Sequence, residues 1–166
     1  MVTRVLIADD DPRITEIHQH YVSKFEGFEV IGLSNTLEDT KLQIEVMEPQ
    51  LILLDIYFPD GSGIELLKEI RLRSQALDII PITAAKEVRL LQEALRGGVF
   101  DYILKPVVFS RFEQTLRRYR THHSNLQSLE SLNQSDIDRI IHQEKPTDSS
   151  RIDAGLPKGI DPVTLD

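Results

Sequence analysis

The chain has 166 residues, and its 27 acidic side chains outnumber its 19 Lys and Arg residues, which gives a formal net charge of -8 with histidine neutral. Hydrophobic residues make up 40% of the chain, a share that is typical of a globular protein and too high for wholesale disorder. The chain has no cysteine, which excludes disulfides and thiolate metal sites, and its acidic charge gives it no electrostatic reason to bind nucleic acid by itself. No signal peptide is visible and no apolar run exceeds four residues, so we expect a cytoplasmic protein without a membrane segment.

The composition changes near residue 120. All ten aromatic residues, six Phe and four Tyr, lie before this point, and the last of them is Tyr119. Beyond it the apolar residues become sparse, and Pro, Ser, Asp and Gln become frequent. We therefore interpret residues 1–121 as one folded domain and residues 122–166 as a helical or flexible linker.

Short apolar runs alternate with helical patterns along the first 121 residues. The runs are almost uninterrupted, which is typical of parallel strands whose two faces are both covered by helices. One of the five runs, at 28–33, fits this pattern less cleanly than the other four. In chain order, the predicted strands are 5–8, 28–33, 51–54, 79–82 and 99–104.

Apolar residues at three- and four-residue spacing predict a helix after each strand. Asp11 is the expected N-cap of the first helix, with Pro12 at its first position. The second helix is expected to end before Pro49, and the Gly-Gly pair at 97–98 is expected to end the fourth. The apolar positions that define the five helices are, in order, Ile14, Ile17, Tyr21 and Phe25; Leu37, Ile44 and Met47; Ile64, Leu67, Ile70 and Leu72; Val88, Leu91 and Leu95; and Phe109, Phe112, Leu116 and Tyr119.

Five βα units in strict alternation predict an α/β fold with a five-stranded parallel sheet and helices on both of its faces. For five strands the expected order is the flavodoxin-like 2-1-3-4-5, followed here by a C-terminal helical linker. In such sheets the ligand site lies at the carboxyl ends of the strands, beside the first strand. The residues that follow each strand are therefore the candidates for function.

Acidic residues stand at the ends of two strands that are predicted neighbours. Asp9 and Asp10 follow the first strand, and Asp55 follows the third. Three carboxylates this close repel one another unless a cation neutralises them, and Mg2+ prefers such oxygen ligands. The alternative is that these acids are helix caps. We favour that alternative for Asp11 and a Mg2+ site for the other three.

Two further residue types at strand ends fit phosphate chemistry. Lys105 follows the fifth strand, where its ammonium can pair with a carboxylate or a phosphate oxygen. Pro106 makes a cis peptide bond after this lysine plausible, because only X-Pro bonds reach the cis form cheaply. Thr83 ends the fourth strand, and its hydroxyl can bond either a backbone carbonyl or a phosphoryl oxygen.

Together these motifs resemble the receiver domain of two-component response regulators. The resemblance covers residues 4 to about 120. It rests on VLIADD at 5–10, LLD at 53–55 with PDG at 59–61, TA at 83–84, and YILKP at 102–106. Each motif is short, but their order and spacing make chance agreement improbable.

The resemblance implies a phosphoryl group on Asp55. It further implies that Asp10 binds Mg2+ directly, that Asp9 does so largely through water, and that Asp55 and the backbone carbonyl of Tyr57 complete the protein ligands. The donor is expected to be a sensor histidine kinase. A receiver of this kind is a phosphoacceptor with slow self-dephosphorylation at most, and not an enzyme that turns over a diffusible substrate.

The resemblance also implies a conformational switch. Thr83, with Ala84 beside it, and Lys105 contact the phosphoryl oxygens, and Tyr102 turns inward as Thr83 moves. The surface expected to respond is that of the fourth helix, fifth strand and fifth helix, through which the chain forms a homodimer. One departure from the family pattern is Ala85, whose small side chain leaves the lifetime of the phosphorylated state open.

Two rival chemistries are excluded, and two groups of polar residues are interpreted as surface residues outside any functional site. The haloacid-dehalogenase type of phosphatase needs a second Asp where this chain has Tyr57, and a dinucleotide site needs a glycine-rich turn after the first strand. Four histidines are interpreted as exposed helix residues. Four arginines of the fifth helix are interpreted as a solvated face in preference to a DNA-binding surface, with salt bridges across a dimer as a third option. These residues are His18, His20, His122 and His123, and Arg111, Arg117, Arg118 and Arg120.

The C-terminal segment gives the most specific indication of subfamily. The sequence LPKGIDPVTL at 156–165 resembles the segment before the helix-turn-helix domain in transcriptional regulators that are paired with citrate- and four-carbon-dicarboxylate-sensing kinases. The stretches at 98–102 and 110–113 resemble that branch too, and SDID at 135–138 predicts a further helix start. We expect DNA binding only through a C-terminal domain absent from this chain. The alternative is a stand-alone receiver that acts by protein–protein contact.

Overall fold

The computed structural model describes residues 2–73, 76–84 and 98–127, together with positions 89, 92, 96, 138, 139 and 141. The chain divides into two units, Met1–Arg120 and Thr121–Asp166. The helices are α1 (Pro12–Ser23), α2 (Leu37–Met47), α3 (Gly63–Leu72) and α5 (Phe109–Gln127). The strands are β1 (Thr3–Ala8), β2 (Phe28–Ser34), β3 (Leu51–Asp55), β4 (Tyr57–Phe58), β5 (Gly61–Ser62), β6 (Asp78–Ala84) and β7 (Ile103–Lys105).

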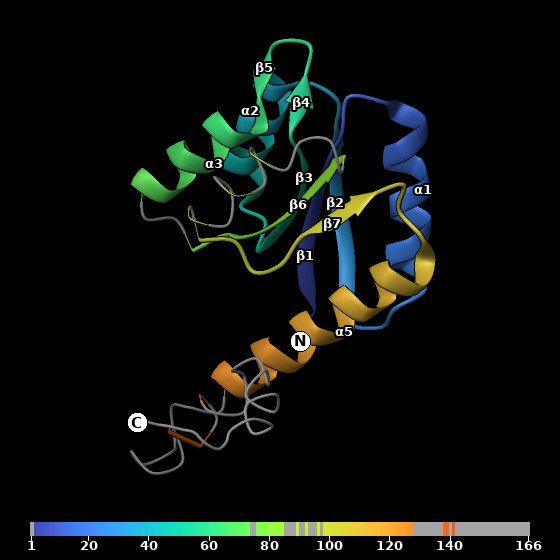
Figure 1. Cartoon of the computed structure of the whole chain (residues 1–166), viewed down its shortest axis with the longest axis vertical. Helices are drawn as coiled ribbons and strands as arrows, with labels where there is room; N and C mark the ends of the chain where they lie inside the picture. The colour runs from blue at the N-terminus through green and yellow to red at the C-terminus, as the bar shows by residue number, and fades with distance from the viewer. Residues whose placement is uncertain are drawn as a thin grey trace, which may run out of the picture. The chain divides into compact units, whose positions relative to one another are not determined.

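Five of the strands form one parallel sheet in the order β2-β1-β3-β6-β7, which confirms the predicted fold (Figure 1). The short strands β4 and β5 form a separate antiparallel hairpin directly after β3. The last strand of the sheet is shorter than the apolar run at 99–104 predicts. Val99 and Phe100 pack against the core on the way into β7 without being part of it, which explains why the run is longer than the strand.

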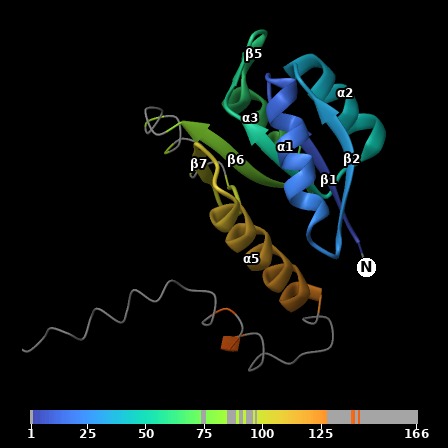
Figure 2. The same cartoon turned by 90° about the vertical axis from the view of Figure 1, so that its right-hand side faces the viewer.

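Two hydrophobic layers enclose the sheet, because successive side chains of each strand point to opposite faces. Leu6, Ile52 and Leu54 belong to the cluster that contains the buried side chains of α2 and α3. Ile7 and Leu53 belong to the cluster formed with α1 and α5. Figure 2 looks onto the face that α1 and α5 cover. The uninterrupted apolar sequence of the central strands is thus explained by burial on both sides.

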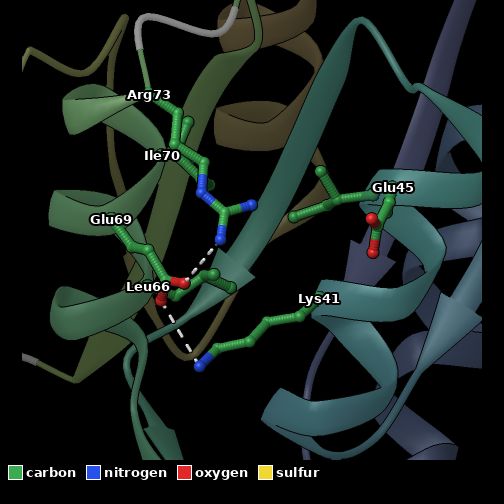
Figure 3. Close-up of a pocket in the computed structure, with 7 residues that line it drawn as sticks. Lys41, Glu45, Leu66, Glu69, Ile70 and Arg73 are labelled. Carbon is green, nitrogen blue, oxygen red and sulfur yellow. Dashed lines mark hydrogen bonds and ion pairs between the residues drawn. The ribbon is translucent and has the colours of Figure 1, made fainter.

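An ion pair joins α2 and α3, the two helices that cover one face of the sheet. Glu69 of α3 lies 3.3 Å from the Lys41 ammonium of α2 and 3.3 Å from the Arg73 guanidinium at the end of α3 (Figure 3). These charges lie at the mouth of a groove whose floor includes Ile44 and Leu66. All three partners are substantially exposed, so these ion pairs contribute little to stability.

Side-chain caps fix the starts of three helices. The Asp11 carboxylate accepts a hydrogen bond from the backbone N–H of Arg13, with Pro12 in the first turn, which confirms the predicted cap of α1. The Thr36 hydroxyl accepts a hydrogen bond from the backbone N–H of Asp39 at the start of α2. The Ser62 hydroxyl accepts one from the backbone N–H of Ile64 at the start of α3. No helix within the described residues is long and apolar enough to cross a membrane.

The buried face of α1 differs from the one predicted. Ile17 is 45% exposed, whereas Thr15, His18 and Val22 are buried. The His18 side chain is only 2% exposed, and its ring lies 5.7 Å from that of Phe112 on α5. The prediction that His18 is an exposed helix residue is therefore wrong: a flat imidazole fills the space between aromatic rings of two helices as well as an aliphatic side chain would.

The buried His18 is expected to make the folded protein less stable in acid. Burial lowers the pKa of His18 to about 4, so the folded protein binds its proton less readily than the unfolded chain does. The contribution of His18 to the free energy of unfolding is therefore fully present above about pH 6.5. It decreases as the pH falls from there toward 4, by about 2 kcal/mol at pH 5. We expect His18→Leu to lack this decrease when the free energy of unfolding is measured by urea unfolding at pH 7.5 and at pH 5.0. His20→Leu, at an exposed position of the same helix, is the control, and an unchanged pH dependence in His18→Leu would contradict the assignment.

The arginines of α5 do not form a simple solvated face. Asp101 is buried, and its carboxylate accepts hydrogen bonds from Arg111 at 3.4 Å and from Arg118 at 3.1 Å. Arg120 donates to the backbone carbonyl of Glu26. Arg118 and Arg120 are exposed, as the interpretation as a solvated face expects, but these arginines also serve as donors to a buried carboxylate and a loop carbonyl.

Several predictions fall outside the described residues. They are the fourth helix, with Val88, Leu91 and Leu95, and the side chain of Ala85. The predicted helix start at 135–138, apart from position 138, and the segment at 156–165 lie outside them as well.

Candidate functional site

Three carboxylates meet at the carboxyl end of the sheet. Ala8 pairs with Leu54 in the β1–β3 register, so Asp9 follows β1 at the level where Asp55 ends β3. Oxygen atoms of Asp9, Asp10 and Asp55 all lie within 4.8 Å of one another. Asp9 is 2% exposed and Asp55 is 6% exposed, whereas Asp10 is open to solvent. The arrangement is one that a hard divalent cation could occupy from the solvent side.

Lys105 brings a positive charge to this cluster from the edge of the sheet. Its ammonium nitrogen lies 3.1 Å from Oδ2 of Asp9 and 3.5 Å from Oδ2 of Asp55. It stands at the end of β7, and the peptide bond to Pro106 is cis. The side chain is 30% exposed, so its head group bridges the buried acids and the solvent.

Burial and charge repulsion together disfavour ionisation of the buried acids. Burial, and after it the charge of the neighbouring Asp9, raise the pKa of Asp55 to about 7, although Lys105 and the N–H of Ile56 oppose the rise. Burial also raises the pKa of Asp9, against a hydrogen bond from the N–H of Asp11 and the charge of Lys105. Burial lowers the pKa of Lys105, but Asp55 and Asp9 outweigh it and raise that pKa overall. Among the described residues, the one ammonium at this site does not balance three carboxylates, so the cluster favours an additional cation.

The backbone holds the Asp55 carboxylate in one orientation. Its Oδ1 atom accepts a hydrogen bond of 2.8 Å from the N–H of Ile56, which leaves Oδ2 facing Lys105. The chain then turns so tightly that a Cβ atom on Gly63 would lie 2.2 Å from the Asp55 carbonyl oxygen. Gly63 also donates its N–H to the Ile56 carbonyl at 2.6 Å. Only glycine allows this close approach of backbone to backbone.

The remaining predicted site residues lie around this centre. Tyr57 is in β4, two residues after Asp55, and its side chain is exposed. Thr83 is buried near the end of β6, where its hydroxyl makes a long bond of 3.5 Å to the Ala84 carbonyl. Ala84 pairs with Lys105 in the sheet.

Tyr102 precedes β7 and contacts α5 from there. Its ring lies 5.6 Å from the guanidinium carbon of Arg111, and its backbone carbonyl accepts a bond from the same side chain. The structure thus brings Asp9, Asp10, Asp55 and Lys105 together. The described contacts of Tyr102 are with Arg111 of α5 and, through its backbone N–H, with Asp101, rather than with the acids of this cluster.

Sequence reasoning missed three residues that shape the site. Asn35 donates to the Asp9 carbonyl at 2.7 Å, Asp60 binds the start of α2, and Asp101 lies buried beside Tyr102. An acid inside the apolar run 99–104 was a usable signal for Asp101. Asn35 and Asp60 act through contacts between distant segments, for which the local sequence holds no signal.

Comparison with known proteins decides the family. The family model described as the response regulator receiver domain matches residues 5–117. The chain belongs to the response regulator receiver domain family. The match covers the sheet, the acid cluster and the lysine of this receiver domain.

Curated relatives cover almost the whole chain. The transcriptional regulatory protein DpiA of Escherichia coli K12 is 39% identical over 164 residues, which span 97% of this chain and 70% of that protein. The transcriptional regulatory protein CitT of Bacillus subtilis is 39% identical over 161 residues, with the same coverage of 97% and 70%. The transcriptional regulatory protein CitB of Klebsiella pneumoniae is 38% identical and covers 96% and 68%. These relatives confirm the predicted resemblance to the citrate and C4-dicarboxylate branch of transcriptional response regulators.

Solved structures confirm the fold of the receiver domain. The REC domain of AraT, a response regulator from Geobacillus stearothermophilus, has a TM-score of 0.70 at 28% identity and covers 76% of this chain and 99% of that one. A CheY-like response regulator receiver domain protein from Methanospirillum hungatei JF-1 has a TM-score of 0.66 at 29% identity and covers 75% and 98%.

Proposed function

We propose that this receiver domain accepts a phosphoryl group on Asp55 from a sensor histidine kinase, in a reaction that requires Mg2+. The observation that carries the proposal is a buried carboxylate with one oxygen 3.5 Å from an ammonium and two further acids within 4.8 Å. A carboxylate is a weak nucleophile, and it forms a mixed anhydride only where charge on the incoming phosphoryl group is neutralised. This cluster concentrates the groups that such neutralisation needs.

The donor set fits Mg2+. Asp10, Asp55 and the backbone carbonyl of Tyr57 are the proposed direct ligands, and Asp9 is proposed to act largely through water. All are oxygen donors, which a hard cation prefers, and the exposed Asp10 leaves the site open to water and phosphate. When bound, the ion supplies charge neutralisation and an anchoring point for phosphoryl oxygens.

The chain's own residues then carry out the transfer. An oxygen of Asp55 forms the new bond to phosphorus as the bond between phosphorus and the kinase's histidine nitrogen breaks. The N–H of Ile56 keeps Oδ1 of Asp55 in place, and the Lys105 ammonium neutralises negative charge beside Oδ2. Because Lys105 is partly exposed, its head group can move from the acids to the phosphoryl oxygens without crossing the core.

We further propose that phosphorylation switches the surface of the fourth helix, β7 and α5. Within the part of the chain that the structure describes, the hydroxyl of Thr83 makes only a long bond to the Ala84 carbonyl, so it is available to donate to a phosphoryl oxygen. As Thr83 moves, Tyr102 turns into the space that it leaves. The switch is a shift in population between two packings, and it alters the homodimer formed through this surface.

At the level of the whole regulator, we propose a cytoplasmic protein that controls transcription through a C-terminal helix-turn-helix domain. Residues 1–121 would be the phosphoacceptor domain and residues 122–166 the linker to it. Genes of citrate or C4-dicarboxylate metabolism are the proposed targets, in line with the relatives described above. The domain is proposed to lack turnover beyond slow loss of its own phosphoryl group.

Treatment with a small phosphodonor tests the proposal. We expect the intact mass of the full chain to increase by one phosphoryl group with acetyl phosphate and Mg2+, and not without Mg2+. Asp55→Asn should gain nothing, whereas Glu45→Gln, at an exposed carboxylate of α2, should behave like the parent. Uptake by Asp55→Asn equal to that of the parent would refute the proposal.

A further inference from the structure

Asp60 connects the hairpin after Asp55 to the start of a helix from a different part of the chain. It lies at the turn between β4 and β5. Its Oδ1 atom accepts the N–H of Leu37 at 2.9 Å, and its Oδ2 atom accepts the N–H of Glu38 at 3.0 Å. The first N–H groups of a helix have no partner within the helix, and a carboxylate is favoured there by the helix dipole. These two bonds also lower the pKa of Asp60, so the carboxylate stays charged at neutral pH.

The helix has a cap of its own, so the bonds of Asp60 do more than begin α2. Thr36 already accepts the N–H of Asp39 at 3.1 Å. A second contact joins the same two segments, because a Cβ atom on Gly61 would lie 2.7 Å from Cδ1 of Leu37. Figure 1 shows the β4–β5 hairpin at the end of the sheet toward which β1 runs, beside α2. The hairpin and the start of α2 are thus joined by the bonds of Asp60 and lie close together at Gly61 as well.

The start of α2 is in turn bonded to the end of β1. The side chain of Asn35 donates to the Asp9 carbonyl at 2.7 Å, and the Asp9 N–H donates to the Ser34 carbonyl at 3.0 Å. A continuous set of bonds therefore runs from Asp9 through residues 34–38 to Asp60. It links the acids carried by β1 to the hairpin without passing through the sheet.

The hairpin needs such support. It contains only two residue pairs, Tyr57 with Ser62 and Phe58 with Gly61. Isolated two-stranded hairpins are marginally stable at best, and this one is shorter than most. Its base is fixed at Gly63, close to Asp55, so Asp60 supplies the second fixed point at the tip.

We infer that Asp60 is a positioning residue that sets the distance between the backbone carbonyl of Tyr57 and the acids at the end of β1. The inference rests on the proposed function, in which that carbonyl and Asp10 hold the same Mg2+ ion. Groups that orient metal ligands through hydrogen bonds affect metal affinity strongly, although they do not touch the metal. Asp60 acts here through the hairpin backbone.

Mg2+ titration of the full chain, followed by amide chemical shifts, tests the inference with a matched pair of variants. Asp60→Ala and Thr36→Ala each remove one side chain that caps α2, but only the side chain of Asp60 joins α2 to the hairpin. We expect Asp60→Ala to raise the Kd for Mg2+ about tenfold and Thr36→Ala to leave it within about twofold of the parent value. Asp60→Asn keeps an amide oxygen as acceptor and should recover part of the affinity.

The outcomes separate the inference from the proposed function. Parent-like Mg2+ affinity in Asp60→Ala, or equal losses in Asp60→Ala and Thr36→Ala, would overturn the positioning role while leaving the metal site intact. A parent protein whose shifts around Asp10 and Asp55 do not respond to Mg2+ would overturn the proposed function and this inference with it. Amide hydrogen exchange gives a readout that needs no metal: residues 57–62 should exchange faster in Asp60→Ala than in Thr36→Ala, and equal rates would count against the inference.

Discussion

Asp55→Asn is expected to make the metal-free receiver domain more stable than the parent by about 4 kcal/mol at pH 8. The side chain of Asn has nearly the same shape but cannot ionise. In the parent, burial and the neighbouring Asp9 raise the pKa of Asp55 to about 7, so the folded state holds this proton more tightly than the unfolded chain does. The parent therefore loses stability as the pH rises from about 4 to about 7, and the variant does not share that loss.

Urea unfolding at several pH values measures this effect. The advantage of Asp55→Asn should be largest above pH 7 and should vanish as the pH falls below 4. Saturating Mg2+ should reduce it at pH 8, because a cation that binds the native acid cluster stabilises the parent by mass action. Glu45→Gln is the control for loss of an exposed carboxylate. A variant less stable than the parent at pH 8 without Mg2+ would show that burial and repulsion of the Asp55 charge do not govern the stability of the acid cluster.

Lys105→Ala is expected to separate phosphoryl acceptance from the switch. Its ammonium lies within 3.5 Å of two buried carboxylates, so removing it should destabilise the metal-free protein by about 2 kcal/mol at neutral pH. Asp55 and the proposed Mg2+ ligands remain, and a small phosphodonor should still add one phosphoryl group. The contact from β7 to the phosphoryl oxygens is lost, so the change in dimerisation should be lost with it.

Light scattering after chromatography, before and after phosphodonor treatment with Mg2+, measures this separation. The parent and Lys68→Ala, at an exposed lysine of α3, should shift their oligomeric state, and Lys105→Ala should not. Lys105→Arg keeps the charge and should retain part of the shift. A normal shift in Lys105→Ala would remove Lys105 from the switch.

The sequence suffices to predict the sheet and the meeting of the acids because both follow from local patterns. Uninterrupted apolar runs such as 51–54 indicate strands buried on both faces, and the alternation with helices determines a parallel order. Once that order is known, Asp9 and Asp55 must share one edge, since neighbouring parallel strands end together. Lys105 reaches them because a lysine side chain is long enough to cross the strand ends.

The features that the sequence does not predict depend on contacts between distant segments. The periodicity of α1 suits a buried Ile17, yet the aromatic rings of α5 select the face that contains His18. The PDG motif at 59–61 indicates a turn but not that Asp60 binds α2. Charge alone does not distinguish arginines that bind the buried Asp101 from those that face solvent.

Chemical mapping of the phosphoryl group tests the central proposal most directly. Borohydride reduces an acyl phosphate on aspartate to homoserine, which marks the modified residue in a peptide digest. After treatment with acetyl phosphate and Mg2+, we expect homoserine at position 55, and none there when Mg2+ is omitted. Homoserine at another aspartate, or no conversion under conditions in which the parent gains the phosphoryl mass, would contradict Asp55 as the acceptor.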